Sequence, residues 1–177
     1  MNKKLLTAVS FLCTMMICGC SKPESSSSAS AAPAPAATSS ASETQAPDAS
    51  GAKVVNIQAS EAMKYDVTSI EVSPGQEVKL TLTNTGSQPK AAMAHNWVLL
   101  KKGSDAAAFD AAALTAAATD YIPAAKADEI IAHTKLLGPH ESDTITFKAP
   151  TEPGDYTFLC TFPAHFQVGM HGVLTVK

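Results

Sequence analysis

Beyond Gly51 the chain is a series of short runs in which apolar and polar residues alternate, with turn-forming residues between them. The run 78–84 shows this pattern, because Val78, Leu80 and Leu82 recur at every second position and so line one face of a strand. Short strands at such intervals are typical of a sandwich rather than of alternating strands and helices. The pattern predicts an all-β, Greek-key β-sandwich of about eight strands, at residues 53–58, 67–72, 78–84, 95–101, 130–136, 143–149, 156–161 and 173–177.

One segment interrupts the series of predicted strands. Residues 105–118 are rich in alanine, with Phe109 and Leu114 as their only large apolar side chains. Alanine has the highest helix propensity, and the side-chain oxygen of Ser104 or Asp105 can cap a helix at its start. We therefore expect one helix, inserted between two strands of the sandwich.

The N-terminal segment has the features of a secretory signal peptide. Residues 1–4 form an n-region charged by two lysines, and the apolar run 5–17 is too short to span a bilayer as a helix. The run ends in Ile-Cys-Gly-Cys, which resembles the bacterial lipobox, where Cys20 is acylated and becomes the mature N-terminus. Ser21 after this cysteine favours sorting to an outer membrane. The alternative is an ordinary signal peptide that happens to contain cysteines.

Residues 21–50 contain no Ile, Leu, Val, Met, Phe, Tyr or Trp. A segment without these residues cannot bury enough apolar surface to offset the entropy of ordering it, so we expect a disordered tether. The chain is therefore predicted to have three parts. They are a lipoprotein signal peptide at 1–19, a lipidated cysteine with its tether at 20–51, and a folded domain at 52–177.

The charge of the chain makes nucleic acid an unexpected partner, and its cysteine content excludes a disulfide within the predicted domain. The chain has 13 basic residues, all of them lysine, and a net charge of −3. Without arginine or a positive surface, nucleic acid is not an expected partner. Cys160 is the only cysteine of the predicted domain, so no disulfide can form within it.

Three residues near the C-terminus are spaced as ligands of one metal ion. Cys160, His165 and Met170 stand five residues apart on a short segment, and His95 would share a strand face with Trp97. Taken singly, methionine is mostly core filler and cysteine a small buried hydrophobe. A Cys-x4-His-x4-Met loop between two strands, however, has no ordinary packing explanation. A plane of two histidines and one cysteine with a long axial methionine is the arrangement of blue-copper sites, so we predict one type 1 copper ion.

The same residues resemble those of the azurins. Cys-Thr-Phe-Pro-Ala-His at 160–165 is similar to their copper loop, and Met-Ala-His-Asn-Trp-Val-Leu at 93–99 is similar to the strand of their first histidine. The segment 131–138 also resembles one of theirs. The gap between His165 and Met170 is one residue longer than in azurins and is similar to that of auracyanins, a sister group of cupredoxins. The resemblance implies a cupredoxin-like fold with one copper ion.

The resemblance also implies roles for residues beside the ligands. Asn96 matches an asparagine of the family, and we expect it to tie the two ligand loops together; the alternative is a surface amide. The backbone carbonyl of Ala94 is a candidate further ligand. Ala94 and Ala164 stand where azurins have glycine, and a methyl group limits the freedom of the backbone. The azurin disulfide near the start of the domain is not possible in this chain.

The predicted site favours electron transfer over catalysis. Four protein ligands leave no open position for water, so we expect no enzymatic activity. His133, His140 and His171 have no second ligand at useful spacing and are expected to be in solvent.

We expect a one-electron Cu(II)/Cu(I) carrier, monomeric and anchored by its lipid to a bacterial outer membrane, with the copper domain in the periplasm or at the cell surface. The resemblance allows cytochromes c, peroxidases, nitrite reductases and oxidases as redox partners. One alternative is a copper-buffering lipoprotein without a redox partner. Another is a metal-free adhesion domain with an immunoglobulin-like sandwich.

Overall fold

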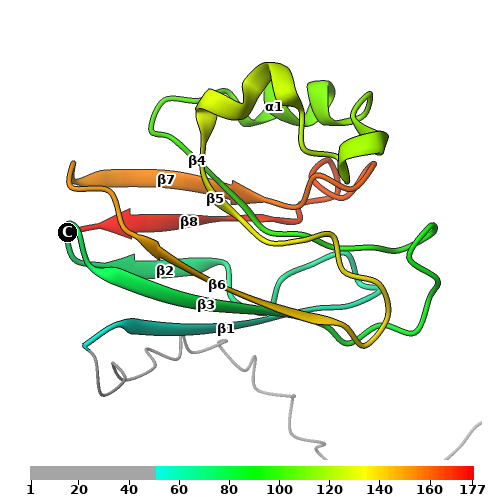
Figure 1. Ribbon diagram of the computed structural model, residues 1–177, viewed down its shortest axis with the longest axis horizontal. Coiled ribbons are helices and arrows are strands. Elements are labelled where there is room, and N and C mark those ends of the chain that lie inside the picture. Colours follow the sequence, from blue (N-terminus) through cyan, green and yellow to red (C-terminus); the bar gives the residue numbers. More distant parts are fainter. Residues whose placement is uncertain (1–50) are drawn as a thin grey trace, which may run out of the picture. The chain divides into compact units, whose positions relative to one another are not determined.

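The computed structural model describes residues 51–177 as a β-sandwich of two sheets (Figure 1). The predicted signal peptide, Cys20 and the predicted tether up to residue 50 lie outside the described residues. One sheet has the strand order β1-β3-β6, and the other has the order β2-β8-β7-β4-β5. The strands are β1 (Lys53–Ala59), β2 (Ser69–Val72), β3 (Glu77–Asn84), β4 (Val98–Leu100), β5 (Ile130–His133), β6 (Ser142–Lys148), β7 (Gly154–Leu159) and β8 (His171–Val176).

Each of the eight predicted strands corresponds to one strand of the structure, so the predicted sandwich is confirmed. β1 pairs in parallel with β3, and β2 pairs in parallel with β8, whereas the other neighbours are antiparallel. Because β1 and β2 belong to different sheets, the chain crosses the sandwich between its first two strands.

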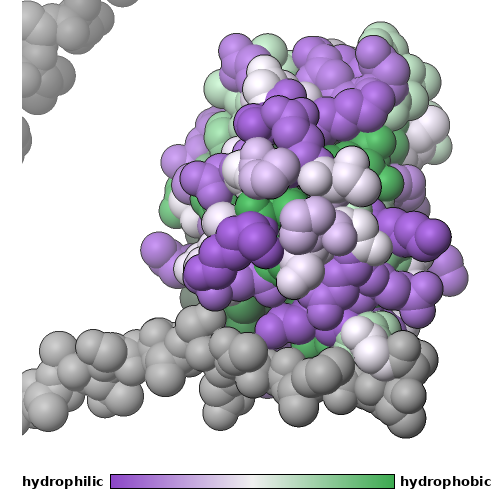
Figure 2. Space-filling view, turned by 90° about the vertical axis from the view of Figure 1, so that its left-hand side faces the viewer, coloured by the Kyte–Doolittle hydropathy of each residue, from purple (hydrophilic) through white to green (hydrophobic). Residues whose placement is uncertain are grey.

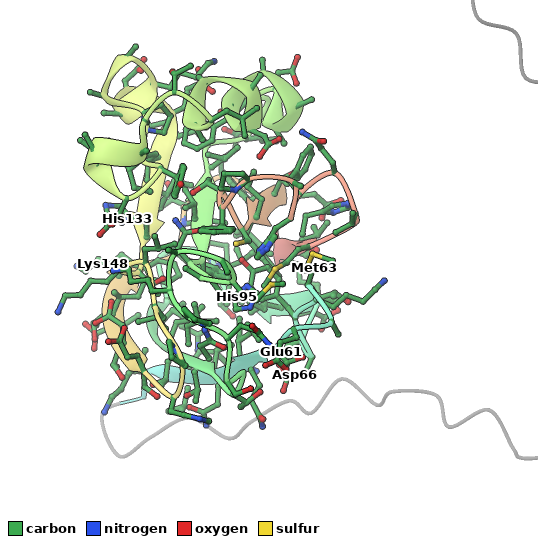
Figure 3. All side chains as sticks on the ribbon, turned by 90° about the vertical axis from the view of Figure 1, so that its right-hand side faces the viewer. Glu61, Met63, Asp66, His95, His133 and Lys148 are labelled. Carbon is green, nitrogen blue, oxygen red and sulfur yellow. The ribbon has the colours of Figure 1, made fainter. Side chains whose placement is uncertain are left out.

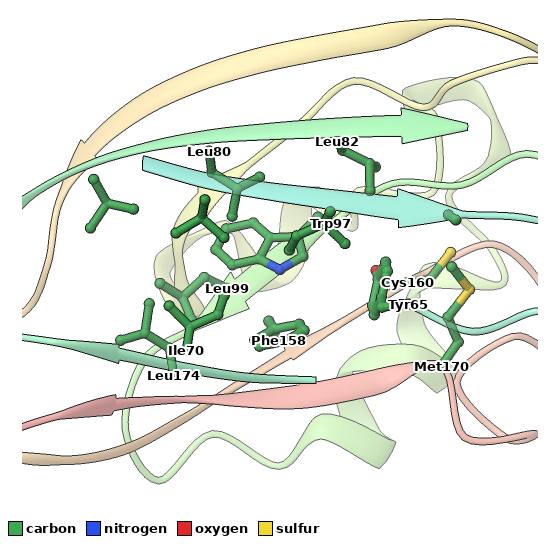
Figure 4. Close-up of a cluster of buried hydrophobic side chains, with 14 of the residues drawn as sticks. Tyr65, Ile70, Leu80, Leu82, Trp97, Leu99, Phe158, Cys160, Met170 and Leu174 are labelled. Atoms are coloured by element: carbon green, nitrogen blue, oxygen red, sulfur yellow. The ribbon is translucent and has the colours of Figure 1, made fainter. Parts of the chain in front are cut away.

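The core lies between the two sheets. Val78, Leu80 and Leu82 of β3 have no exposed surface, in agreement with their alternating pattern. The rings of Trp97 and Phe158 lie in the same cluster with their centroids 5.4 Å apart (Figure 4). Burial of each such large side chain contributes about 1.5–3 kcal/mol. The cluster continues to Cys160 and Met170, whose sulfur atoms Figure 4 shows at one end of it.

The inserted helix covers the outer face of the larger sheet. Helix α1 (Ala106–Ala113) begins at Asp105, whose carboxylate accepts hydrogen bonds from the amides of Ala107 and Ala108. Phe109 of this helix has no exposed surface and packs against a second apolar cluster on that sheet, made of Val98, Leu100 and Leu159.

The predicted length of the helix is wrong. Instead of one helix over 105–118, α1 is followed by two 3₁₀ helices, η1 (Ala117–Thr119) and η2 (Ala124–Glu129). The hydroxyl of Thr115 donates to the carbonyl of Ala112, and Asp120 adopts a left-handed conformation. Alanine alone does not extend the helix, because beyond Ala113 no residue up to Thr119 is buried against the sheet.

The predicted strand 95–101 is also shorter than expected, since only Val98–Leu100 form a strand, and their pairing with β5 shifts register between Leu99 and Leu100. His95 forms an isolated bridge with Leu137, with amide-to-carbonyl distances of 3.1 and 2.8 Å. The amide of Trp97 donates to the hydroxyl of Thr134, at 3.0 Å, instead of to a backbone carbonyl. A side chain thus replaces one bond of the ladder, and His95 lies in an irregular but well-bonded segment.

The two ends of the sandwich carry different groups. β7 runs from Gly154 at one end to Leu159 at the other, where Cys160 follows. At the Gly154 end, the hydroxyl of Tyr156 donates to the carbonyl of Glu152 at 2.8 Å, which is the contact of a tyrosine corner. The chain enters β1 at this same end (Figure 1). None of the helices in residues 51–177 is long and apolar enough to cross a membrane.

Candidate metal centre

Three of the predicted ligand side chains meet in one buried cluster. His95, Cys160 and His165 each place a donor atom within 4.8 Å of the other two. His95 and Cys160 have no exposed surface, and His165 is 2% exposed. Within residues 51–177 no other group of three or more His, Cys, Asp or Glu side chains comes together in this way.

The loop between β7 and β8, residues 160–170, is closed by its own backbone. The amide of Cys160 donates to the carbonyl of Met170 at 3.1 Å, and the amide of Met170 donates to the carbonyl of His165 at 3.0 Å. The sulfur of Cys160 lies 3.5 Å from Nδ1 of His165. Met170 is fully buried, and Figure 4 shows its sulfur at the same end of the core as that of Cys160.

His95 lacks the hydrogen-bond partners that buried imidazoles usually have. Neither ring nitrogen of His95 has a hydrogen-bond partner, although the residue is completely buried. Its ring lies against that of His165, with centroids 4.9 Å apart. A buried polar atom without a partner costs about 1–3 kcal/mol, so these nitrogens fit a site that is completed by a metal ion.

Asn96 connects the two segments that carry these residues. Its side-chain amide donates to the hydroxyl of Thr161 at 2.8 Å, and its side-chain carbonyl accepts from the amide of Thr161 at 2.9 Å. Both residues are buried, with exposures of 1% or less. The bonds join the segment of His95 to the loop of Cys160, and Asn96 is not a surface amide.

Sequence reasoning did not foresee three of the groups that support the site. The hydroxyl of Tyr65 donates to the backbone carbonyl of Asn96, and Thr134 and Thr161 supply the bonds described above. Thr161 could have been noticed, because it follows Cys160 directly. Tyr65 and Thr134 are distant in the sequence from the residues that they contact, so no local pattern marks them.

The remaining histidines do not join the cluster. His133 is exposed and lies apart from His95 (Figure 3), with its Nδ1 3.0 Å from the carbonyl of Thr134. His140 is exposed, and His171 is the first residue of β8 with its ring against Phe166, at 5.3 Å between centroids. Their expected exposure to solvent is confirmed.

A family model for copper-binding proteins of the plastocyanin/azurin type matches residues 52–177. The chain belongs to the plastocyanin/azurin family of copper-binding proteins. The resemblance to azurins and auracyanins is thereby confirmed, and so is copper as the cofactor of this member of the family.

Individual relatives agree with this family. Auracyanin-B of Chloroflexus aurantiacus is 35% identical over 144 residues, which are 75% of this chain and 60% of that protein. Outer membrane protein H.8 of Neisseria gonorrhoeae is 37% identical over 131 residues, which are 72% of this chain and 69% of that protein. The crystal structure of dithionite-reduced auracyanin from Roseiflexus castenholzii is 44% identical with a TM-score of 0.63, and the match covers 70% of this chain and 96% of that one. The chain thus spans less than two thirds of auracyanin-B but nearly all of the solved auracyanin domain.

Alanine precedes both clustered histidines, as Ala94 and Ala164. Ala164 has a φ of 70°, a conformation that costs a residue with a side chain about 1 kcal/mol or more. Ala94 is buried next to His95, and the amide of His95 donates to the carbonyl of Leu137. The copper protein therefore accepts backbone strain at Ala164, at the residue before His165.

Burial shifts the pKa of each of the three clustered side chains in the direction that favours its neutral form. It raises the pKa of the Cys160 thiol to about 12, with amides of Asn96 and Phe162 acting in the opposite direction. It lowers the pKa of His95 to about 4, partly offset by the Ser60 backbone and by Glu61. It also lowers the pKa of His165 to about 4, helped by repulsion from His95. The metal-free site therefore favours a neutral thiol and two neutral imidazoles, and copper binding must release the thiol proton.

The metal-free protein should lose stability as the pH falls from about 6.5 to about 4. In this window the unfolded chain protonates His95 and His165 while the folded chain does not, so the unfolded state binds more protons and the free energy of unfolding rises with pH. We expect a loss of about 2–4 kcal/mol between pH 7 and pH 5. Urea denaturation of the metal-free protein at both pH values measures it. A His140→Gln variant, which lacks only an exposed ring, should show the same loss. Equal stability at pH 7 and pH 5 would contradict the assignment of two buried neutral histidines.

Proposed function

We propose that this chain is an electron carrier with one type 1 copper ion, held by the thiolate of Cys160, the imidazoles of His95 and His165, and the thioether of Met170. The backbone carbonyl of Ala94 is a candidate fifth ligand. The observation that carries this proposal is the buried meeting of three donor atoms within 4.8 Å, in which His95 has no other partner for either nitrogen.

The donor set suits copper better than other ions. Thiolate and thioether are soft ligands, and with imidazole they favour copper over Mg²⁺ or Ca²⁺, which take oxygen. When bound, copper supplies the exchange of a single electron between its Cu(II) and Cu(I) states.

The protein contributes to electron transfer by holding the ligands in one arrangement and by excluding water. The ligand side chains are at most 2% exposed, so water has little access to them. The backbone bonds of the 160–170 loop and the Asn96–Thr161 pair fix the two segments relative to each other. A site fixed in this way changes little when an electron arrives or leaves, which keeps transfer fast.

His165 is the proposed exit for the electron. Its ring packs against Phe162, at 4.9 Å between centroids, on a loop whose Val168 is 48% exposed. Met93 and Phe166 are half-buried; Met93 stands two residues before His95, and Phe166 follows His165 directly. A small apolar surface suits brief docking with a redox protein. Cytochromes c, peroxidases, nitrite reductases and oxidases are the proposed classes of partner.

The proposed location is a bacterial outer membrane, with a lipid on Cys20 and the tether up to residue 51 between lipid and domain. Two observations support it: the lipobox-like sequence before Cys20, and the similarity to a relative that is itself called an outer membrane protein. The copper domain would then move within the reach of its tether and meet partners held at the same membrane.

Addition of Cu(II) to the metal-free protein should produce an intense blue absorption, because the buried thiolate binds the ion directly. The blue colour should disappear with one electron per copper and return on mixing with an oxidised cytochrome c. An optical titration followed by stopped-flow mixing measures both. Weak colour, or no exchange with any redox protein, would favour the copper-buffering alternative. Failure to take up copper would leave a metal-free adhesion domain.

A further inference from the structure

A hollow of about 430 Å³ lies at the Gly154 end of the sandwich, away from the metal centre. The residues that line it include three lysines, Lys101, Lys102 and Lys148, and one acidic residue, Glu152. Figure 2 looks onto this end of the domain and shows hydrophilic residues around smaller hydrophobic areas. The apolar part of the lining comes from Ile131, Pro150 and Tyr156.

Two of the three lysines form no ion pair in the part of the chain that the structure describes. The ammonium group of Lys102 donates to Glu152, at 2.6 Å, and to the carbonyl of Pro153, at 2.9 Å. The side chains of Lys101 and Lys148 have no hydrogen bond or ion pair in residues 51–177. Glu77 stands opposite Lys148 in the strand register, but none of the ion pairs within residues 51–177 joins the two side chains. The hollow therefore keeps a positive charge, although the whole chain has a net charge of −3.

The lysines of the hollow lie at the end where the chain enters the domain. Lys53 begins β1 and pairs with Val78 of β3, and the neighbouring Glu77 pairs with Lys148, so Lys53 and Lys148 flank the same end of one sheet. Cys20 and the tether precede Lys53 in the sequence. If Cys20 carries a lipid, this end of the domain is the one attached most directly to the membrane.

We propose that the hollow of Lys101, Lys102 and Lys148 binds the phosphate groups of anionic lipid headgroups. Ammonium groups bind phosphate as point charges, and each lysine near an anionic membrane surface strengthens binding roughly five-fold. The proposal rests on the lipid anchor of the proposed function, because a tethered domain meets the membrane at a high local concentration at which even weak sites fill. Binding at this end holds the His165 loop at the opposite end, facing away from the bilayer and accessible to a partner.

Sedimentation with lipid vesicles tests the proposal. The probe protein is the copper-loaded chain of residues 20–177 with Cys20→Ser, which carries no lipid, at low ionic strength where charges act over about 30 Å. It should bind vesicles of phosphatidylglycerol and not those of phosphatidylcholine. The double variant Lys101→Gln/Lys148→Gln removes only the two unpaired lysines and should weaken binding roughly thirty-fold.

A matched control separates the hollow from net charge. Lys64→Gln/Lys135→Gln changes the net charge equally at exposed positions outside the hollow, and it should change vesicle binding by less than about two-fold. Equal weakening by both pairs, or equal binding to phosphatidylcholine, would overturn the proposal. Inorganic phosphate that perturbs the amide resonances of Lys101 and Lys148, with no binding to vesicles, would assign the hollow to a soluble anion instead. The blue absorption of each variant is recorded first, so that a failure of the copper site is seen separately from a failure of lipid binding.

Discussion

Replacement of Cys160 by serine should abolish the intense blue absorption of the copper-loaded protein while the sandwich remains folded. The colour requires a sulfur-to-copper bond, and a serine hydroxyl is a poor ligand for copper at neutral pH. Cys160 has no exposed surface and its sulfur contacts His165, so serine fills nearly the same space beside a hydrogen-bonding partner. A Cu(II) titration followed by visible absorption measures the colour, and circular dichroism measures the fold.

The control for this variant is His133→Gln, which removes an exposed histidine outside the cluster and should leave the blue colour intact. Cys160 is the only cysteine that the described domain contains, so no other thiolate in it can take over. A Cys160→Ser protein that stays blue would therefore show that the copper lies elsewhere. Loss of the blue colour in the His133→Gln variant would likewise show that the copper is not bound at the proposed cluster.

The strands were predictable because alternation is a local property with a clear physical cause. Leu80 and Leu82 are buried and Lys79 is exposed, as the two-residue period of a strand requires. The start of the helix was predictable as well, since Asp105 caps it through its own side chain. Both features depend on residues that are close together in the sequence.

The irregular parts depend on distant residues and could not be derived in this way. The segment of His95 departs from a regular strand because Thr134 takes the position of a backbone carbonyl, and the two residues are far apart in the sequence. The helix ends early because no buried residue follows Ala113 in the next turn, although its alanines continue. Propensity describes what a segment prefers alone, whereas packing decides where it stops.

The spacing of the ligands predicted most of the residues of the candidate site, but not the residues that hold its loop in place. The five-residue intervals of Cys160, His165 and Met170 are visible in the sequence because one loop carries all three. The loop also contacts α1, where the side-chain amide of Gln167 lies 3.4 Å from the buried carboxylate of Asp110. No sequence pattern marks Asp110 within the alanine-rich segment, and only the fold shows that it faces the loop.

Replacement of Asn96 by leucine should lower the free energy of unfolding of the metal-free protein by about 3–5 kcal/mol. Leucine is similar in size but cannot bond Thr161, so the buried amide of Thr161 loses its acceptor and its hydroxyl loses a donor. Each buried group left without a partner costs about 1–3 kcal/mol. With copper bound, the His95 segment and the 160–170 loop would no longer be fixed to each other, so the blue band should broaden and the reduction potential should shift. Urea denaturation, visible absorption and voltammetry measure the three effects.

A double-mutant cycle identifies the contact responsible. Thr161→Val removes only the hydroxyl and keeps the backbone amide, so alone it should cost less than Asn96→Leu, about 1–2 kcal/mol. Because the two side chains bond each other, the double variant should be less destabilised than the sum of the single variants, by about 1 kcal/mol. Strict additivity would mean that the bond to the Thr161 hydroxyl contributes nothing, and that Asn96 acts through its bond to the Thr161 backbone amide or through other contacts. An unchanged blue band in a folded Asn96→Leu protein would mean that the 160–170 loop keeps the copper geometry by its own backbone bonds.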